Sequence, residues 1–218
     1  MTPADAASRL ATAATELQLS LSAKQIEQLL AYARLLHRWN GTYNLTALRE
    51  PDQILSHHLV DCLAVVNPLR ARLPGRRGRI LDVGSGGGLP GVVLAVLDPE
   101  IAVTCVDAVG KKAAFVQQVQ VELKLANLMS VHARAEALPR GRDGYEVLIS
   151  RAFASLSDFV ECTRGLLAAD GIWMAMKGKD PRAEVAAIPS DIDVFHVERL
   201  HVPDVGAERH LVWMRSLS

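Results

Sequence analysis

The sequence of 218 residues predicts an α/β fold built on a mostly parallel sheet, and three observations support this class. From residue 80 onward, short apolar segments typical of strands alternate with helical segments, which is the pattern of βαβ units. A glycine-rich run over residues 84–91 connects the first of these strands to the first of these helices. The preceding 70 residues show only helical periodicity, which predicts a helical extension in front of the sheet.

The helical extension is expected to contain three helices and to form an N-terminal lobe over residues 1–70. Residues 5–19 are rich in alanine and follow a helical pattern. Ser22 and Gln25 have the spacing of a capping box, so a second helix is expected to begin there. Pro51 is well suited to the first turn of a third helix, which is expected to extend to about residue 66.

Residues 71–218 are expected to form one Rossmann-like domain. Right-handed crossovers place the carboxyl ends of parallel strands at one edge of the sheet, so a ligand site is expected at that edge. The last two β-like segments predict a hairpin that closes the sheet with an antiparallel C-terminal strand. Strands are predicted at residues 80–83, 102–106, 128–132, 147–150, 171–176, 193–197 and 210–214, and helices at residues 89–97, 110–125 and 156–168.

The composition argues against strong binding to nucleic acid through overall charge. Half of the residues are hydrophobic, and 24 basic residues balance 24 acidic ones, although a local basic face is still compatible with this balance. Cys62, Cys105 and Cys162 have neither disulfide nor zinc spacing, and no metal site is expected. The sequence shows no signal-peptide pattern and no apolar run of membrane-spanning length, which favours a cytoplasmic protein without a membrane partner.

The glycine-rich run is the most informative local feature, because Asp82 stands directly in front of it. Glycines allow the backbone to approach a ligand and to adopt dihedral angles that a Cβ forbids. A carboxylate at this position would repel a diphosphate but would attract a ligand that carries an ammonium group. S-adenosylmethionine has an ammonium group and no phosphate, so Asp82, Gly84, Gly86 and Gly88 predict a site for this methyl donor. A surface turn without a ligand is the less favoured alternative, because so many glycines increase the entropy lost on folding.

Two alignments of the run predict different ends for the first strand. A G-x-G-x-x-G dinucleotide pattern begins at Gly86 and requires the strand to continue to Ser85, which would indicate a nucleotide-dependent oxidoreductase. A G-x-G-x-G pattern begins at Gly84, directly after the strand, and leaves Leu89 where the dinucleotide pattern needs glycine. We favour the second alignment, because the first places Asp82 near a pyrophosphate.

Polar residues also follow the second and third strands at the same predicted edge. Asp107 ends the second strand, where a carboxylate accepts hydrogen bonds either from ribose hydroxyls or from the start of the next helix. The ribose role is favoured because of the neighbouring glycine run. Arg134, Ala135 and Glu136 follow the third strand, where their backbone would frame an adenine ring, although the tripeptide by itself is more typical of a solvated loop.

Basic residues follow the fourth and fifth strands. Arg151 has a planar guanidinium that suits a phosphate or a guanine edge, and an ion pair with Glu146 or Asp158 is an equally compatible alternative. Lys177 ends the fifth strand and is expected to lie on the same edge as Arg151. The basic connector at residues 70–79 enters at the opposite edge of the sheet, so it is expected to link the two lobes rather than to line the site.

His57, His58 and Asp61 lie together on the third predicted helix. They would form part of a metal or acid/base site only with a further ligand, and the sequence does not indicate one. A hydrogen bond in the core or between the lobes is therefore favoured for them.

The motifs together resemble a known family over nearly the whole chain after about residue 19. The chain is similar to the bacterial 16S ribosomal RNA (guanine-N7) methyltransferase G family, which is also called glucose-inhibited division protein B. The segments ISRAFAS and WN-x-x-x-NLT are more specific than the glycine run, which many methyltransferases share. Small departures are Cys62 and Ala207, where the family usually has serine and glycine. The matching segments are residues 39–46, 58–61, 82–91, 107–111, 149–155, 176–178 and 208–211.

The resemblance implies the fold of class I S-adenosylmethionine-dependent methyltransferases and transfer of methyl to N7 of one guanosine in the decoding region of 16S rRNA. It implies S-adenosylhomocysteine as the product and the small ribosomal subunit or a precursor particle as the partner. A monomer is expected. Arg151 is expected to orient the target or the donor, and Arg134, Lys177 and Arg209 are expected to bind RNA. The family's pattern implies that five residues contact the methyl donor or line its immediate surroundings: Gly84, Leu89, Ala135, Glu136 and Arg151.

Overall fold

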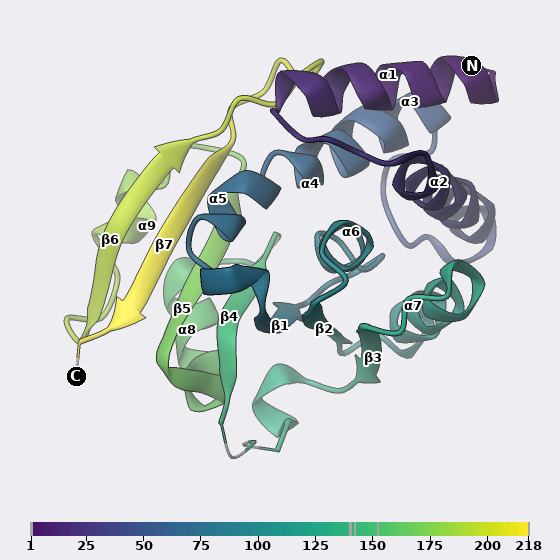
Figure 1. Ribbon diagram of the computed structural model, residues 1–218. Coiled ribbons are helices and arrows are strands. Elements are labelled where there is room, and N and C mark those ends of the chain that lie inside the picture. The colour runs from purple at the N-terminus through teal and green to yellow at the C-terminus, as the bar shows by residue number, and fades with distance from the viewer. Residues whose placement is uncertain (1, 140, 142, 152, 218) are drawn as a thin grey trace.

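The computed structural model describes residues 2–139, 141, 143–151 and 153–217, and Figure 1 shows its arrangement. Within these residues, seven strands form one sheet in the order β3-β2-β1-β4-β5-β7-β6. β7 is antiparallel to both of its neighbours, and the other strand pairs of the sheet are parallel, as predicted. The strands are β1 (Gly78–Val83), β2 (Ile101–Asp107), β3 (Leu128–His132), β4 (Tyr145–Ser150), β5 (Leu167–Lys177), β6 (Ile192–Arg199) and β7 (His210–Ser216).

The helices follow the predicted order, with differences at four places. The third predicted helix is divided by a π-helical turn, η1 (Leu55–Val60), in which Asp61 N–H donates to the carbonyl of Ser56 five residues earlier. The helix predicted to end at residue 168 ends at Thr163, and a 3₁₀ turn over Arg164–Leu166 leads into β5, which begins at Leu167. Two short helices, α5 and α9, were not predicted. The helices are α1 (Pro3–Glu16), α2 (Ala23–Tyr43), α3 (Pro51–Ile54), α4 (Asp61–Leu63), α5 (Val66–Arg70), α6 (Gly91–Leu97), α7 (Gly110–Leu123), α8 (Leu156–Thr163) and α9 (Arg182–Val185).

The sheet separates two hydrophobic cores, and the strands supply alternate residues to each. In β1, Ile80 belongs to the core that packs under α1, α2, α6 and α7, whereas Leu81 and Val83 belong to the core under α8. The sheet is therefore covered by helices on both faces, which explains why its central strands are almost wholly apolar (Figure 1). No helix in the described part of the chain is long and apolar enough to span a membrane.

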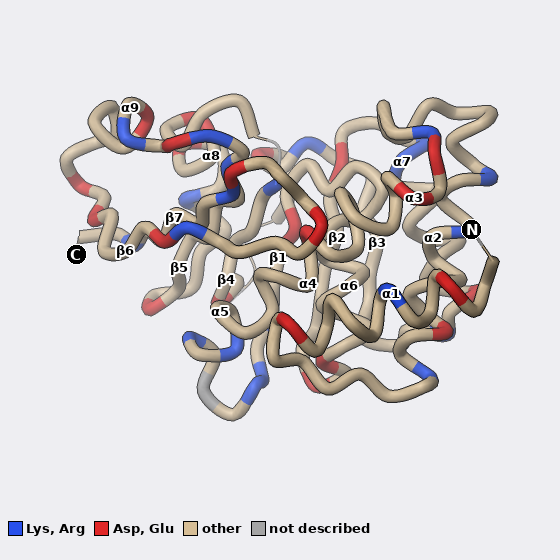
Figure 2. Tube along the Cα trace, turned by 90° about the horizontal axis from the view of Figure 1, so that it is seen from above, with Lys and Arg blue, Asp and Glu red and all other residues tan. Residues whose placement is uncertain are grey.

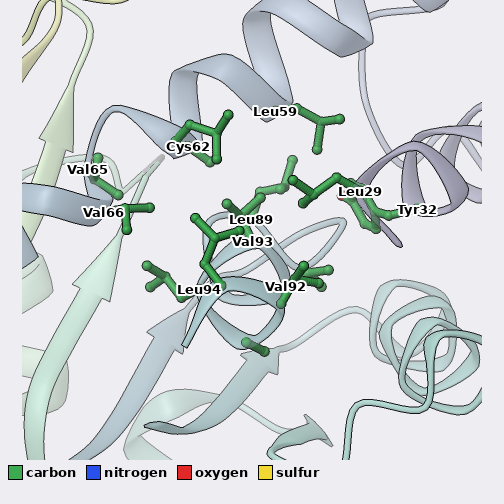
Figure 3. Close-up of a cluster of buried hydrophobic side chains, with 14 of the residues drawn as sticks. Leu29, Tyr32, Leu59, Cys62, Val65, Val66, Leu89, Val92, Val93 and Leu94 are labelled. Atoms are coloured by element: carbon green, nitrogen blue, oxygen red, sulfur yellow. The ribbon is translucent and has the colours of Figure 1, made fainter. Parts of the chain in front are cut away.

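The N-terminal helices share a core with α6. Leu29 and Tyr32 of α2 and Leu59 of η1 surround the apolar residues of α6, as Figure 3 shows. Gln25, which also forms the predicted capping box with Ser22, donates to the carbonyls at the end of α6. One hydrophobic core contains residues from both predicted parts of the chain. The division into a lobe of residues 1–70 and a domain of residues 71–218 stays a prediction.

Candidate active site

The glycine turn begins where β1 ends. β1 ends at Val83, so the alignment that begins at Gly84 agrees with the structure and the dinucleotide alignment, which needs a strand to Ser85, does not. Gly84, Gly86 and Gly88 have φ values of +65°, +59° and +84°, which are conformations that side chains with a Cβ rarely adopt. The sequence therefore needs glycine at these positions to turn the chain from β1 into α6.

The glycines of the turn face different surroundings. A Cβ placed at Gly84 or Gly86 would meet no described atom within 4 Å, so both backbones border open space. A Cβ at Gly88 would lie 2.7 Å from Val92 Cγ2, so this glycine permits close packing inside the protein. Leu89 is buried in the core, and its N–H donates to the carbonyl of Ser85. The first two glycines are thus the ones that leave room for a ligand against the backbone.

Gly91 permits close contact between α6 and the sheet, and we expect Gly91→Ala to destabilise the fold. Its Cβ would lie 2.5 Å from Cys105 Sγ and 2.9 Å from Asp82 Oδ2. Overpacking of this kind costs about 1–3 kcal/mol, measurable as a lower free energy of unfolding in urea. Gly41→Ala is the control, because its Cβ would meet no described atom within 4 Å and alanine favours a helix. Equal stability of the two variants would contradict the packing role of Gly91.

Asp82 is fully buried under the turn. Its Oδ2 accepts a hydrogen bond of 2.8 Å from the N–H of Gly91, while Oδ1 has no partner among the described residues. Burial raises the pKa of Asp82 to about 7, against the opposing effects of the Gly91 N–H and the positive charge of Arg151. The carboxyl group therefore holds the start of α6 and keeps one oxygen available for a further polar partner.

Asp107 connects the second strand to the glycine turn. Its Oδ2 accepts from the N–H of Gly86 at 2.9 Å, and its Oδ1 accepts from the N–H of Val109 at 2.8 Å. This second bond goes to the residue before α7 and not to an N–H of its first turn, so the capping alternative is not confirmed. Each carboxylate oxygen has a second lone pair, so the predicted contact with ribose hydroxyls stays compatible with this arrangement.

The tripeptide after β3 lies beside Asp107, because the N–H of Ala133 donates to the carbonyl of Asp107. Ala135 is buried against the second core, whereas Arg134 and Glu136 are exposed. The described part of the chain contains no hydrogen-bond or ion-pair partner for Arg134, whose guanidinium therefore faces solvent. Residues 135–137 form a 3₁₀ turn at the edge where β1 and β2 also end.

Arg151 reaches back to the helical segment rather than to its own neighbourhood. Its Nη1 donates to His58 Nδ1 at 3.0 Å and lies 3.8 Å from Asp61 Oδ2. The alternative of an ion pair with Glu146 or Asp158 is wrong, because the arginine that pairs with Glu146 is Arg79.

His58 has partners at both ring nitrogens. Arg151 Nη1 and the carbonyl of His57 lie 3.0 Å and 3.1 Å from its Nδ1, and Thr46 Oγ1 lies 2.8 Å from its Nε2. Burial and the positive charge of Arg151 lower the pKa of His58 to about 4, so the ring is neutral at pH 7. The predicted hydrogen bond between the helical segment and the sheet is confirmed for His58.

Arg209 and Lys177, both predicted to bind RNA, are already engaged in ion pairs. Arg209 Nε donates to Asp61 Oδ1 at 2.6 Å, and Lys177 Nζ lies 2.9 Å from Glu184 Oε2. The sequence did not single out Glu184, because this partner lies in the unpredicted helix α9. Asp61 was assigned only to a core or interlobe bond, and its two arginine partners come from loops far away in the sequence.

Charges of both signs lie at the carboxyl edge of the sheet. Figure 2, which views the molecule of Figure 1 from above, shows basic segments interspersed with acidic ones over the elements on this side.

Within the described ranges, no group of three His, Cys, Asp or Glu side chains could hold a metal ion. The basic connector at residues 70–79 is held at the opposite edge, where Arg70 pairs with Asp98 at 2.8 Å.

The arrangement is chemically suited to S-adenosylmethionine. Open space over Gly84 and Gly86 leaves the backbone accessible, and the unpartnered Oδ1 of Asp82 suits an ammonium group. The structure thus brings Asp82, the glycine turn and Asp107 together at one edge, and the charge of Arg151 acts on Asp82 from the same region.

Relatives with similar sequences are ribosomal RNA methyltransferases by name. The chain is 56% identical to the Ribosomal RNA small subunit methyltransferase G of Leptothrix cholodnii, over 96% of this chain and 95% of that protein. It is 53% identical to the protein of the same name from Albidiferax ferrireducens, over 92% of each chain.

Solved structures with lower identity show the fold. TrmN from Thermus thermophilus is 19% identical, with a TM-score of 0.56 over 75% of this chain and 53% of that chain. The 1,6-didemethyltoxoflavin-N1-methyltransferase of Burkholderia thailandensis, solved with S-adenosylhomocysteine, is 16% identical, with a TM-score of 0.57 over 91% of this chain and 92% of that chain. The fold is therefore the Rossmann-like fold of class I S-adenosylmethionine-dependent methyltransferases. Residues 25–212 match the family described as GidB, rRNA small subunit methyltransferase G, and the chain belongs to this family.

Proposed function

We propose that this protein transfers the methyl group of S-adenosylmethionine to N7 of one guanosine in the decoding region of 16S rRNA. The observation that carries the proposal is the buried Asp82, with one unpartnered oxygen under a glycine turn whose backbone borders open space, in a chain of this family. S-adenosylhomocysteine is the other product. We place this activity in the cytoplasm, in a monomer that acts on the small ribosomal subunit or a precursor of it.

The donor would lie across the carboxyl ends of β1, β2 and β3. When bound, S-adenosylmethionine supplies an electrophilic methyl group on a sulfonium. Asp82 would hold the ammonium group, Asp107 the ribose hydroxyls, and the turn after β3 would border the adenine. The residues proposed to hold the donor are Asp82, Gly84, Gly86, Gly88, Leu89, Asp107, Ala135, Glu136 and Arg151.

The chemistry asks for orientation rather than for a base. Guanine N7 has a lone pair in the ring plane and no proton to lose, so its in-line attack on the methyl group needs no general base. Orientation of two reactants contributes up to about 7–11 kcal/mol to lowering the barrier. Arg151 lies at the end of β4, where its free N–H groups would hold guanine O6 and turn N7 towards the donor.

The basic side chains at this edge would contribute unequally to RNA binding. Arg134 is exposed and has no partner within the described residues, whereas Lys177 and Arg209 already pair with Glu184 and Asp61. Arg134 is therefore the best suited of the three to neutralise a phosphate. Because the net charge of the chain is zero, the folded ribosomal particle would have to supply shape recognition as well.

Arg134→Ala is expected to reduce the salt dependence of RNA binding. Loss of one phosphate contact lowers the slope of log K against log salt by about 0.7–0.9. Binding to small subunits at several salt concentrations measures this slope. Arg77→Ala is the matched control, because Arg77 is exposed at the opposite edge of the sheet and pairs with Glu100. An unchanged slope in Arg134→Ala would remove Arg134 from the RNA contact.

The proposed function is tested by transfer of labelled methyl to small subunits from a strain that lacks this modification. Label recovered as 7-methylguanosine in 16S rRNA would support the proposal, whereas label in another nucleoside would refute the assigned position. S-adenosylhomocysteine is expected to raise the melting temperature, and NAD is not. Absence of transfer despite donor binding would leave the fold in place and discard the proposed substrate.

A further inference from the structure

Asp61 is a buried carboxylate between two arginines, and no step of the proposed reaction uses it. Its Oδ1 accepts from Arg209 Nε at 2.6 Å, and its Oδ2 lies 3.8 Å from Arg151 Nη1. The Asp61 side chain is only 4% exposed, so solvent and salt screen these attractions weakly. One carboxylate thus faces two guanidiniums, one with each oxygen.

The three side chains come from three separate parts of the fold. Asp61 begins α4 directly after the π-helical turn η1, Arg151 follows β4, and Arg209 precedes β7. π-helical turns are rare and are frequently found at functional sites. The turn η1 places Asp61 and His58 over the carboxyl edge, where the carbonyl of His57 also lies 3.4 Å from Arg151 Nη1. The helical segment therefore determines where both arginines lie.

Both arginines keep N–H groups for further partners. Arg209 uses Nε for Asp61 and Nη1 for the carbonyl of Glu208, and Arg151 uses Nη1 for its contacts to the helical segment. Within the described residues, Nη2 of Arg209 makes no hydrogen bond. The guanidinium of Arg151 also interacts with the buried Cys62 thiol, and with five N–H groups it still keeps donors for a further partner. Since His58 is neutral at pH 7, the group of Asp61, Arg151 and Arg209 has one positive charge more than it has negative charges. It therefore still attracts an anion such as an RNA phosphate.

We propose that Asp61 is a positioning residue that fixes the guanidinium groups of Arg151 and Arg209 relative to each other. RNA bound at Arg209 would then present its target guanine beside Arg151. The inference rests on the proposed function, which puts Arg151 at the donor and Arg209 at the RNA. Because one carboxylate holds both guanidinium groups, the position of the RNA at Arg209 and the position of the target guanine at Arg151 depend on each other. Asp61 acts through the two guanidiniums and touches neither substrate.

The chain offers a matched control for a merely structural role. Asp98 is also buried and accepts hydrogen bonds of 3.0 Å and 2.8 Å from Nε and Nη2 of Arg70. It follows α6 and lies at the amino edge of the sheet, opposite the proposed site. Asp61→Asn and Asp98→Asn each remove the charge of a buried, arginine-paired aspartate, and they differ in their place in the fold.

The test compares kcat and KM for small subunits, donor affinity and unfolding in the two variants. We expect kcat/KM to fall by about 100-fold in Asp61→Asn, because displacement of about 1 Å at a reacting centre has effects of this size. Affinity for S-adenosylhomocysteine is expected to change far less than kcat/KM. Asp98→Asn is expected to lower stability and to leave kcat/KM unchanged. Asp61→Glu keeps the charge but displaces it by one methylene group, so it is expected to keep only part of the activity. If Asp61→Asn does not fold, wild-type kcat/KM in Asp61→Glu would overturn the inference.

A double variant tests whether Asp61 acts through its partner. If it does, the losses of activity in Asp61→Asn and Arg209→Ala are expected to be less than additive in the double variant, and the loss that remains comes from the displaced Arg151. Additive losses, or equal activity of Asp61→Asn and Asp98→Asn, would overturn the inference. These outcomes can be distinguished from failure of the proposed function. In that case the wild-type protein itself would transfer no methyl group, and the inference about Asp61 would also be wrong.

Discussion

Asp82→Asn is expected to bind S-adenosylhomocysteine about 10²–10³-fold more weakly than the wild-type protein and to lose methyl transfer accordingly. The Asp82 side chain is fully buried, and its Oδ1 has no partner among the described residues. An ammonium group placed against this oxygen would gain a charge-assisted hydrogen bond that a neutral amide cannot replace. Asparagine keeps an oxygen that accepts from the N–H of Gly91, so the variant is expected to fold.

The affinity of the wild-type protein for S-adenosylhomocysteine is also expected to rise with pH up to about pH 7 and to level off above it. Burial raises the pKa of Asp82 to about 7, and a cationic ligand requires the ionised carboxylate. Below this pKa a proton must leave before the ligand binds, so affinity falls about tenfold for each pH unit. Calorimetry with S-adenosylhomocysteine at pH 6 and pH 8 measures the rise, which Asp82→Asn is expected to lack.

Asp98→Asn is the control for Asp82, since it neutralises another buried aspartate far from the turn. Asp98→Asn is expected to bind S-adenosylhomocysteine with the affinity and the pH dependence of the wild-type protein. If Asp82→Asn bound the ligand like the wild-type protein, with the same pH profile, Asp82 would serve only to hold the start of α6.

Arg151→Ala is expected to lower kcat/KM for small subunits by about 10²–10³-fold, as loss of one positioned donor does in other enzymes. The variant removes the N–H groups proposed to hold guanine O6 and also the contact between Arg151 Nη1 and His58 Nδ1. Arg151→Lys is expected to recover little activity, because an ammonium group lacks the planar fork of the guanidinium. Steady-state methyl transfer with purified small subunits provides the measurement.

Arg70→Ala separates this effect from general loss of stability. Arg70 is partly buried and pairs with Asp98 at the opposite edge, so its loss is expected to reduce stability without reducing kcat/KM. Near wild-type activity in Arg151→Ala, under conditions where it is fully folded, would remove Arg151 from the transfer step.

Local patterns in the sequence predicted most of the fold. The capping box of Ser22 and Gln25, the end of β1 before Gly84 and the βαβ alternation all depend on residues close together in the chain. The third helix was predicted as one regular element because its apolar spacing does not reveal the π-helical turn within it. The end of α8 was placed too late because the apolar residues before β5 fit a helix as well as a strand.

The sequence by itself determined the glycine turn, the acidic residues around it and hence the methyl-donor hypothesis, because turn conformations and strand ends depend on local dihedral angles. The tertiary structure decided which charges meet. Arg151 is 93 residues from His58, and Arg209 is 148 residues from Asp61. Long side chains can reach several partners, and the choice depends on how the helical segment packs over the sheet edge. Only the folded chain could therefore exclude the alternative pair of Arg151 with Glu146 or Asp158 and show the pair with the buried Asp61.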